Sequence, residues 1–394
     1  MPASIRVPFL FTMIVMSSAL WAPAAPQVKY TNEPISPREE PKPDKYPPPP
    51  PVDPEEVKRI QSDLFGLLEK EQAFQGVGTQ LISDPGVTTY RIYVNMRLPW
   101  PKLLEDFLAD PARFLNLPRA AVTRTADAAS ADETSCVGRW CFKPVRMEPL
   151  RTFAARMGGS TSTRAGCFEG TVGVHVVDNT SGATGYVTNN HVAGAEGPLL
   201  CPNAGRARQV APGMKITMCQ AGPTAGRLQR RAEIEFAPDD NVVDAAFVKA
   251  GNVRCDGCGI HPNGEWYTRT SLAGPSAASL QLLKCGVGSD PTKSGVGSLT
   301  TNGRVVSNDV SLKLIFLPCG LTAKFIQQIE IEAVEAVAGV RQPFAQSGDS
   351  GAWVFDQRGK AVGMIFAGDE DRRTFVNPAD AVLSKLDVSI VRCH

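Results

Sequence analysis

The sequence of 394 residues has almost no net charge, few aromatic residues and only four histidines. Its 41 Lys and Arg residues are balanced by 40 Asp and Glu residues, which gives a formal net charge of +1. Because no basic excess is available to neutralise phosphates, nucleic acid is excluded as the main partner. Beyond the N-terminal region, no segment approaches the ~20 consecutive apolar residues that cross a bilayer, so we expect no membrane span there.

The first 25 residues have the composition of a secretory signal peptide. One cation, Arg6, precedes an apolar stretch at 7–21, and small residues follow at 22–24. This order predicts cleavage by a signal peptidase and a protein that is secreted, either periplasmic or extracellular. The alternative, an uncleaved membrane anchor, is disfavoured by the short apolar core.

Export determines how the ten cysteines are interpreted. In an oxidising compartment an even count indicates disulfides, although connectivity cannot be read from sequence. Cys136 with Cys141, and Cys255 with Cys258, are candidate pairs because each pair is close in sequence. Cys255, Cys258 and His261 also have a spacing found in zinc sites but lack a clear fourth ligand, so we expect a disulfide and no metal.

Proline and charge dominate residues 26–54, which cannot bury enough apolar surface to offset the entropy of ordering. We therefore expect an extended, stiff linker there. From residue 55 to residue 128, helix-period and strand-period patterns predict a small α/β domain. This domain is either a prodomain or a docking domain that stays attached. A polar stretch at 129–160 predicts a second linker.

Residues 161–394 have the pattern of a β-rich domain. Short apolar runs recur between glycine, proline and asparagine turns, which is typical of a barrel or sandwich rather than of alternating β and α units. A C-terminal helix is predicted in "NPADAVLSKLDV", with Asn377 as its N-cap. The expected fold is mostly β, with two β-barrels and a C-terminal helix, preceded by the small α/β domain.

Three polar residues in apolar surroundings indicate a nucleophilic site. His191, in "GYVTNNHVAG", follows an apolar strand, which places its ring at a strand end that faces a cleft. Asp244, in "NVVDAAFVKA", is flanked by apolar residues, and a carboxylate buried there needs a partner such as an imidazole N–H. Ser350, in "QSGDSG", needs a base within hydrogen-bond reach in order to act as a nucleophile.

Gly348 and Ser350 are candidate donors to an oxyanion. Gly348 lets the backbone turn so that its own N–H and that of Ser350 point to one spot, where they would stabilise a tetrahedral intermediate. This chemistry requires no cofactor. Among the remaining polar residues, His175 lies inside an alternating strand and is interpreted as structural, and Asp239 and Asp240 are interpreted as turn residues.

The order of these motifs resembles that of the trypsin/chymotrypsin-fold serine peptidases. "VTNNHV", "DAAFVK" and "GDSGAWVF" occupy the places of that family's histidine, aspartate and serine motifs. The sequence looks most like bacterial exported trypsin-like peptidases with an "NNHV" histidine motif. The resemblance implies a double β-barrel, hydrolysis of polypeptides through an acyl-enzyme intermediate, and His191, Asp244 and Ser350 as the catalytic triad.

Two departures from this family concern activation and specificity. No "IVGG"-like segment precedes the domain, so Asp349 is not assigned the pairing with a newly cut N-terminus that zymogen-type members use. The resemblance places Phe344 at the base of the specificity pocket. It also implies that the pocket wall is formed by Phe366, Ala367 and Gly368, which favours an apolar or small substrate side chain.

Two alternative functions come from other classes of protein. A catalytically silent binding or adhesion module of the cell exterior would keep the barrels, but here all three triad positions are occupied. An α/β-hydrolase-type esterase requires the order Ser, Asp, His, and only His394 follows Ser350. The sequence therefore favours an exported serine endopeptidase.

Overall fold

The computed structural model describes about three-fifths of the chain, in segments separated by gaps. The described residues are 53–84, 87–117, 122–126, 133–147, 151–152, 170–193, 212–213, 215–216, 226–236, 239–251, 260–272, 280–285, 302–316, 321–334, 343–346, 348–369 and 373–392. The predicted signal peptide, nearly all of the proline-rich linker, and the candidate pair Cys255 and Cys258 lie outside these segments.

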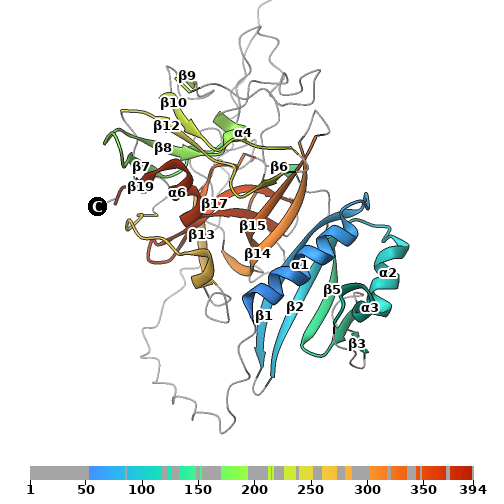
Figure 1. The fold of residues 1–394 in the computed structure, drawn as a ribbon. Coiled ribbons are helices and arrows are strands. Elements are labelled where there is room, and N and C mark those ends of the chain that lie inside the picture. The colour runs from blue at the N-terminus through green and yellow to red at the C-terminus, as the bar shows by residue number, and fades with distance from the viewer. Residues whose placement is uncertain are drawn as a thin grey trace, which may run out of the picture. The chain divides into compact units, whose positions relative to one another are not determined.

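The N-terminal part is an α/β unit, coloured blue to green in Figure 1. Its elements in chain order are α1 (Pro54–Leu68), β1 (Phe74–Asp84), β2 (Val87–Met96), α2 (Lys102–Ala109), α3 (Pro111–Leu115), β3 (Val122–Ala126), β4 (Glu133–Val137) and β5 (Trp140–Arg146). Helix α1 begins where the Asp53 side chain accepts a hydrogen bond from the Glu55 N–H at 3.0 Å. On its apolar stripe, Ile60 and Leu64 are fully buried in the core of the unit.

Two expectations for this unit are wrong. The apolar pattern of residues 100–115 predicts a single helix, but the structure has two, because Asp110 ends α2 and its side chain accepts the Arg113 N–H at 3.3 Å to cap α3. The linker predicted at 129–160 contains β4 and β5, and β5 pairs in parallel with β2. Alternate residues of β5 are buried, so its polar residues lie on the outer face of a strand rather than in a loop.

The predicted disulfide between Cys136 and Cys141 is confirmed. The two cysteines are directly opposite each other in the β4–β5 hairpin. The disulfide therefore connects two strands inside the segment that was expected to be a linker.

Six strands of the C-terminal half close into a barrel. In order around the ring they are β14 (Gly303–Phe316), β15 (Leu321–Ala333), β18 (Arg373–Pro378), β17 (Ala361–Gly368), β16 (Trp353–Asp356) and β13 (Leu282–Cys285), which pairs with β14 again. Apolar side chains from all six of these strands form one buried cluster, which includes Val305, Ile331 and Val354. One of the two predicted barrels is therefore present as a closed ring.

The second sheet also has six strands. In spatial order they are β19 (Val388–Ile390), β7 (His175–Asp178), β8 (Thr184–Thr188), β12 (Ala246–Lys249), β10 (Gly226–Arg231) and β9 (Lys215–Ile216). Helix α6 (Ala379–Leu386) connects β18 to β19, as Figure 1 shows beside β17. A shared apolar cluster contains Phe247 of this sheet, Trp353 of the barrel and Val382 of α6. The fold is mostly β with a C-terminal helix, as predicted.

The α/β unit is joined to the barrel by backbone pairing. Strand β1 runs antiparallel to β14, with Gly76 opposite Leu312. A Cβ atom at Gly76 would lie 2.4 Å from the Ser311 carbonyl oxygen, so only glycine permits this approach. Through this pairing the strands of the unit and of the barrel belong to one sheet of thirteen strands, which also contains β6 (Arg151–Thr152) and β11 (Asp240–Asn241).

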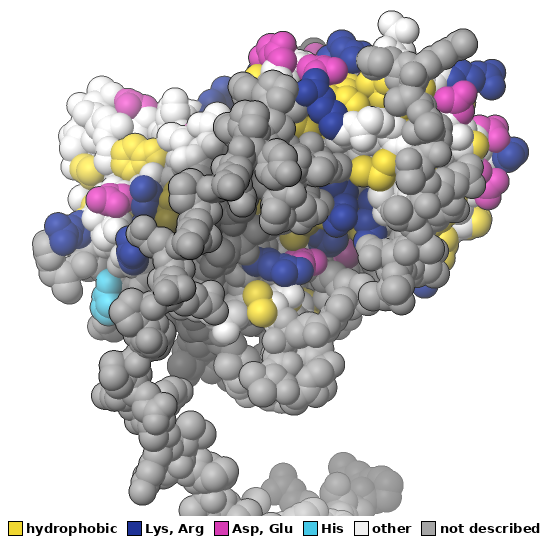
Figure 2. All heavy atoms as spheres, turned by 90° about the horizontal axis from the view of Figure 1, so that it is seen from below, with side chains coloured by type: hydrophobic (Ala, Val, Ile, Leu, Met, Phe, Trp, Pro, Cys, Tyr) yellow, Lys and Arg dark blue, Asp and Glu magenta, His cyan; other side chains and the backbone are white. Residues whose placement is uncertain are grey.

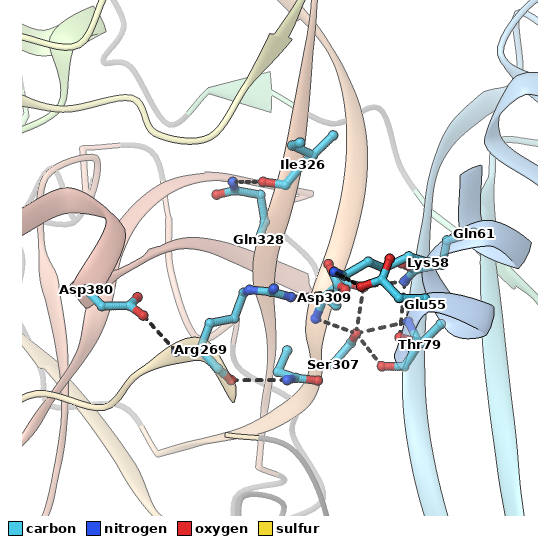
Figure 3. A network of polar contacts seen from close by, with 11 residues as sticks. Glu55, Lys58, Gln61, Thr79, Arg269, Ser307, Asp309, Ile326, Gln328 and Asp380 are labelled. Atoms are coloured by element: carbon cyan, nitrogen blue, oxygen red, sulfur yellow. Dashed lines mark hydrogen bonds and ion pairs between the residues drawn. The ribbon is translucent and has the colours of Figure 1, made fainter. Parts of the chain in front are cut away.

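Buried side chains add hydrogen bonds at the same junction (Figure 3). Gln61 of α1 donates to Thr79 Oγ1 at 3.1 Å and to the Asp309 carbonyl oxygen at 2.7 Å. The Thr79 N–H donates to Ser307 Oγ at 3.0 Å. The unit is therefore attached through satisfied polar groups as well as through a sheet edge.

On the surface, charges of both signs are mixed. Figure 2 shows Lys and Arg side chains beside Asp and Glu side chains on the face that it draws. Examples of surface ion pairs are Arg139 with Glu56 at 2.6 Å and Lys324 with Asp240 at 2.9 Å. Within the described segments, none of the helices has the length and apolar character needed to cross a membrane.

Candidate active site

His191, Asp244 and Ser350 meet where the second sheet faces the barrel. His191 lies in the short helix α4 (Asn190–Ala193) directly after β8, Asp244 just precedes β12, and Ser350 just precedes β16. His191 Nε2 is 2.9 Å from Ser350 Oγ. On the other side of the ring, His191 Nδ1 is in short hydrogen-bond contact with Asp244 Oδ2. The imidazole therefore lies between the carboxylate and the hydroxyl.

Asp244 holds His191 with both carboxylate oxygens. While Oδ2 contacts the ring, Oδ1 accepts the His191 backbone N–H at 3.1 Å. Both residues are buried, Asp244 completely and His191 with 6% of its surface exposed. A buried carboxylate is costly unless it accepts hydrogen bonds, and here both of its oxygens do. The contact to Nδ1 fixes the tautomer in which Nε2 is free to accept a proton from Ser350.

Two buried asparagines fix the backbone of Asp244. Asn189 Nδ2 donates to the Asp244 carbonyl oxygen at 2.8 Å, and the Asp244 N–H donates to Asn377 Oδ1 at 3.0 Å. Both asparagines are fully buried. They determine where the carboxylate lies without contacting its oxygens.

The expected role of Asn377 is wrong. Helix α6 has Pro378 at its N-cap position and no side-chain cap hydrogen bond. The Asn377 amide faces Asp244 instead. The signal that could have identified it is the one used for Asp244, a polar residue within an apolar strand, here "TFVNP".

The turn around Ser350 is built on two glycines with positive φ. Gly348 has φ +98° and Gly351 has φ +93°, a region that favours glycine. At Gly351 a Cβ would also lie 2.3 Å from the Thr171 carbonyl oxygen. Thr171 in turn donates its N–H to the Ser350 carbonyl oxygen at 2.7 Å and its Oγ1 to the Gly348 carbonyl oxygen at 2.9 Å.

The N–H groups of Gly348 and Ser350 are the predicted oxyanion donors. Neither donates a hydrogen bond to any other residue that the structure describes. The Asp349 carbonyl oxygen accepts the Ala352 N–H at 2.8 Å. Because a trans peptide is planar, the Ser350 N–H of the same peptide unit points the opposite way. This arrangement suits the predicted oxyanion site.

The four predicted specificity residues lie in the barrel near this turn. Phe344 is fully buried in the barrel interior, where a Cβ at Gly303 would lie 2.6 Å from its ring. Phe366 is fully buried in a separate cluster, with its ring centroid 5.0 Å from that of Phe325. Ala367 is also fully buried, and Gly368 ends β17. Their role in substrate binding stays a prediction.

A segment of the chain itself lies along this end of β17. Strand β6 (Arg151–Thr152) pairs antiparallel with β17, with Thr152 opposite Ala367 and Arg151 opposite Gly368. Two residues earlier in β17, the Ile365 carbonyl oxygen accepts the Gly351 N–H at 3.0 Å. The β6 backbone is therefore paired with the strand that also contacts the Ser350 turn.

The remaining sequence candidates lie away from the triad contacts. His175 is half-buried in β7, and burial lowers the pKa of its imidazole. Asp239 and Asp240 are exposed, and Asp240 pairs with Lys324. His261 is exposed as well. Across the described segments, no group of three or more His, Cys, Asp or Glu residues is arranged to hold a metal ion.

Comparisons with known proteins give limited information. No family model matches the chain, and no curated protein matches it. Among solved structures, the chain is similar to the crystal structure of Rv3671c protease in its inactive form, with 17% sequence identity over 55% of this chain and 89% of that chain. The TM-score of 0.27 is too low for this likeness to bear on activity.

Proposed function

We propose that the protein is an exported serine endopeptidase that cleaves polypeptides through an acyl-enzyme intermediate. The observation that carries the proposal is the His191 imidazole between two partners, with Nε2 2.9 Å from Ser350 Oγ and Nδ1 in contact with the Asp244 carboxylate. Nucleophile, base and orienting carboxylate are thus in the geometry that acyl transfer requires.

In the first step Ser350 Oγ attacks the carbonyl carbon of the substrate, and its proton moves to His191 Nε2. A C–O bond forms, and the carbonyl oxygen becomes an oxyanion that accepts hydrogen bonds from the N–H groups of Gly348 and Ser350. Asp244 stabilises the imidazolium and is not itself protonated. When the tetrahedral intermediate collapses, the C–N bond breaks and the amine leaves with the proton from Nε2.

In the second step water attacks the acyl-enzyme ester. His191 Nε2 accepts a proton from the water and then returns it to Ser350 Oγ as the C–O bond to the serine breaks. The second product is a carboxylic acid, and the enzyme is restored. All proton transfers use side chains of the chain, so the proposed reaction needs no cofactor.

A polypeptide substrate is supported by the pairing of β6 with β17. Strand addition to a sheet edge is a recurrent way to bind an extended peptide, because main-chain hydrogen bonds give affinity without a sequence requirement. The end of β17 accepts such a segment next to the Ser350 turn. The apolar character of Phe344 and Phe366 favours an apolar or small substrate side chain beside the cleaved bond.

The test is labelling with a peptidyl phosphonate, together with cleavage of a peptide library. We expect wild-type protein to be labelled at one serine and to cleave the library. Ser350→Ala should lose both activities, whereas Ser389→Ala, in β19, should keep them. If folded wild-type protein neither reacts with the phosphonate nor cleaves any peptide, the catalytically silent binding module is the correct alternative.

Export is part of this proposal and has its own measurement. N-terminal sequencing of the protein recovered from outside the cytoplasm should find a start near residue 25. The same measurement decides the fate of the α/β unit, because a start beyond residue 147 would identify the unit as a removed prodomain. A start at residue 1 would contradict the signal-peptide prediction.

A further inference from the structure

Behind the Ser350 turn lies an ion pair in the barrel interior that the proposed mechanism does not use. Lys284 Nζ of β13 contacts Asp349 Oδ2, and Asp349 directly precedes Ser350. Lys284 is 3% exposed and Asp349 is fully buried. Lysine and aspartate are among the residues least often buried in proteins, and they are buried almost only when paired.

This ion pair anchors the inner side of the turn. Asp349 Oδ2 also accepts the Gln346 N–H at 2.9 Å, and the Asp349 N–H donates to the Gln346 carbonyl oxygen at 2.9 Å. The carbonyl oxygen of Asp349 accepts the Ala352 N–H. Asp349 is therefore held at its side chain and at both of its peptide groups, and these groups connect it directly to Gly348 and Ser350.

The orientation of Asp349 sets the orientation of its two neighbours. The peptide between Asp349 and Ser350 carries one of the proposed oxyanion donors, and the Ala352 N–H that binds its carbonyl oxygen orients this planar group. Gly348 and Gly351 flank the turn with positive φ, where glycine allows many other backbone conformations. Hydrogen bonds from Thr171 hold the carbonyl oxygens of Gly348 and Ser350, whereas the Asp349 side chain between them is held by Lys284 and the Gln346 N–H.

Stability alone does not account for the ion pair. Burying two charges costs several kcal/mol per ion, and apolar residues of similar volume usually serve a core as well or better. In some proteins a buried polar pair serves instead to fix one conformation. Lys284 lies within the sequence and not at a terminus, so its ammonium group can pair with Asp349 without any cleavage of the chain.

We propose that Lys284 is a positioning residue that holds the Ser350 turn in its oxyanion-binding conformation. The inference rests on the proposed peptidase function and adds the step by which the site is assembled. Because a side chain supplies the cation, the turn is formed without a cut that creates a new N-terminus.

The experiment measures phosphonate labelling and peptide cleavage per folded molecule, well below the thermal midpoint of each variant. We expect Lys284→Met to lower kcat/KM and the labelling rate by about 100-fold or more, the effect of losing one oxyanion donor. Lys284→Arg keeps the cation and should recover at least a tenth of wild-type activity. The control Lys324→Met, at the surface pair with Asp240, should change the labelling rate less than two-fold.

A double variant separates positioning from folding. Lys284→Met/Asp349→Leu removes both buried charges, so we expect it to fold even where the single variant does not. Its labelling rate should stay about 100-fold low. A wild-type rate in this double variant, or in a folded Lys284→Met, would overturn the proposal while the function itself stands. If wild-type protein has no activity, the proposed function fails first, and this inference fails with it.

Discussion

The core of the α/β unit and the candidate active site around Ser350 are both buried, but they are built from different residues. The core of the unit is apolar, with aromatic contacts such as Phe107 with Phe142 at 5.0 Å and Phe65 with Phe74 at 5.1 Å. The candidate active site is polar. Its buried groups include Asn189, Asn190, His191, Asp244, Asp349, Ser350 and Asn377.

This difference indicates that the apolar core provides stability and that the polar site provides a fixed geometry. Apolar packing is non-directional, and a core tolerates substitution as long as volume and pattern are kept. Buried hydrogen bonds are directional, and an unsatisfied partner carries a full desolvation cost. We therefore expect substitutions in the core of the α/β unit to lower stability and substitutions in the candidate active site to lower activity.

The largest effect should come from Asp244→Asn. The asparagine is nearly isosteric but cannot hold the imidazole in the required tautomer, and a carboxylate-to-amide change of this kind lowers kcat by about 10⁴-fold. Thermal unfolding should change much less. The matched control is Asp240→Asn, at an exposed carboxylate, which should leave kcat unchanged. A variant of Asp244 that retains wild-type kcat would contradict the triad.

Phe107→Ala tests the other region. Truncating a fully buried phenylalanine typically costs about 3–5 kcal/mol, which thermal or denaturant unfolding will measure. Activity per folded molecule should be unchanged, since the ring packs within the core of the α/β unit. A loss of kcat in fully folded protein would show that the two regions are coupled through the β1–β14 pairing.

Asn377→Leu is expected to lower both stability and activity. It leaves the Asp244 N–H without its acceptor, at a cost of about 1–3 kcal/mol. Because small displacements of a catalytic group reduce the rate steeply, we expect kcat to fall by up to about 100-fold. A change in unfolding without any change in kcat would make Asn377 purely structural.

The smallest effect is expected for removal of the disulfide. Cys136→Ser/Cys141→Ser opens a loop with a sequence separation of 5, for which chain entropy gives about 2 kcal/mol. Peptide cleavage should be unaffected. The measurement is the thermal midpoint of this variant beside that of reduced wild-type protein, and the two should agree.

Much of the site was predictable from the sequence, because polar residues within apolar runs are costly and therefore informative. Asp244 was identified in this way and His191 by its place at the end of an apolar strand, and the two side chains are in contact. The same reasoning was not applied to Asn377, since the following proline favoured a helix cap. Lys284 gave no signal either, because a lysine at the end of "SLQLLK" is typical of an exposed strand end.

The fold was predictable where periodicity was strong. Helix α1 and the mostly β character of the C-terminal half follow from apolar spacing. Strand β5 was missed because its outer face is polar, and β4 because polar residues, Thr134 and Ser135, occupy buried positions in it. The pairing of β1 with β14 joins residues more than two hundred positions apart, and local pattern carries no information about such contacts.

The pairing of β6 with β17 has a consequence for kinetics. A sheet edge has one set of backbone donors and acceptors, so an incoming chain must displace Arg151 and Thr152 before it can occupy the positions opposite Ala367 and Gly368. A tethered strand competes at an effective concentration of about millimolar for a short linker. Short, weakly held peptides will therefore be turned over slowly, and replacing Arg151 and Thr152 by two prolines should accelerate their hydrolysis most.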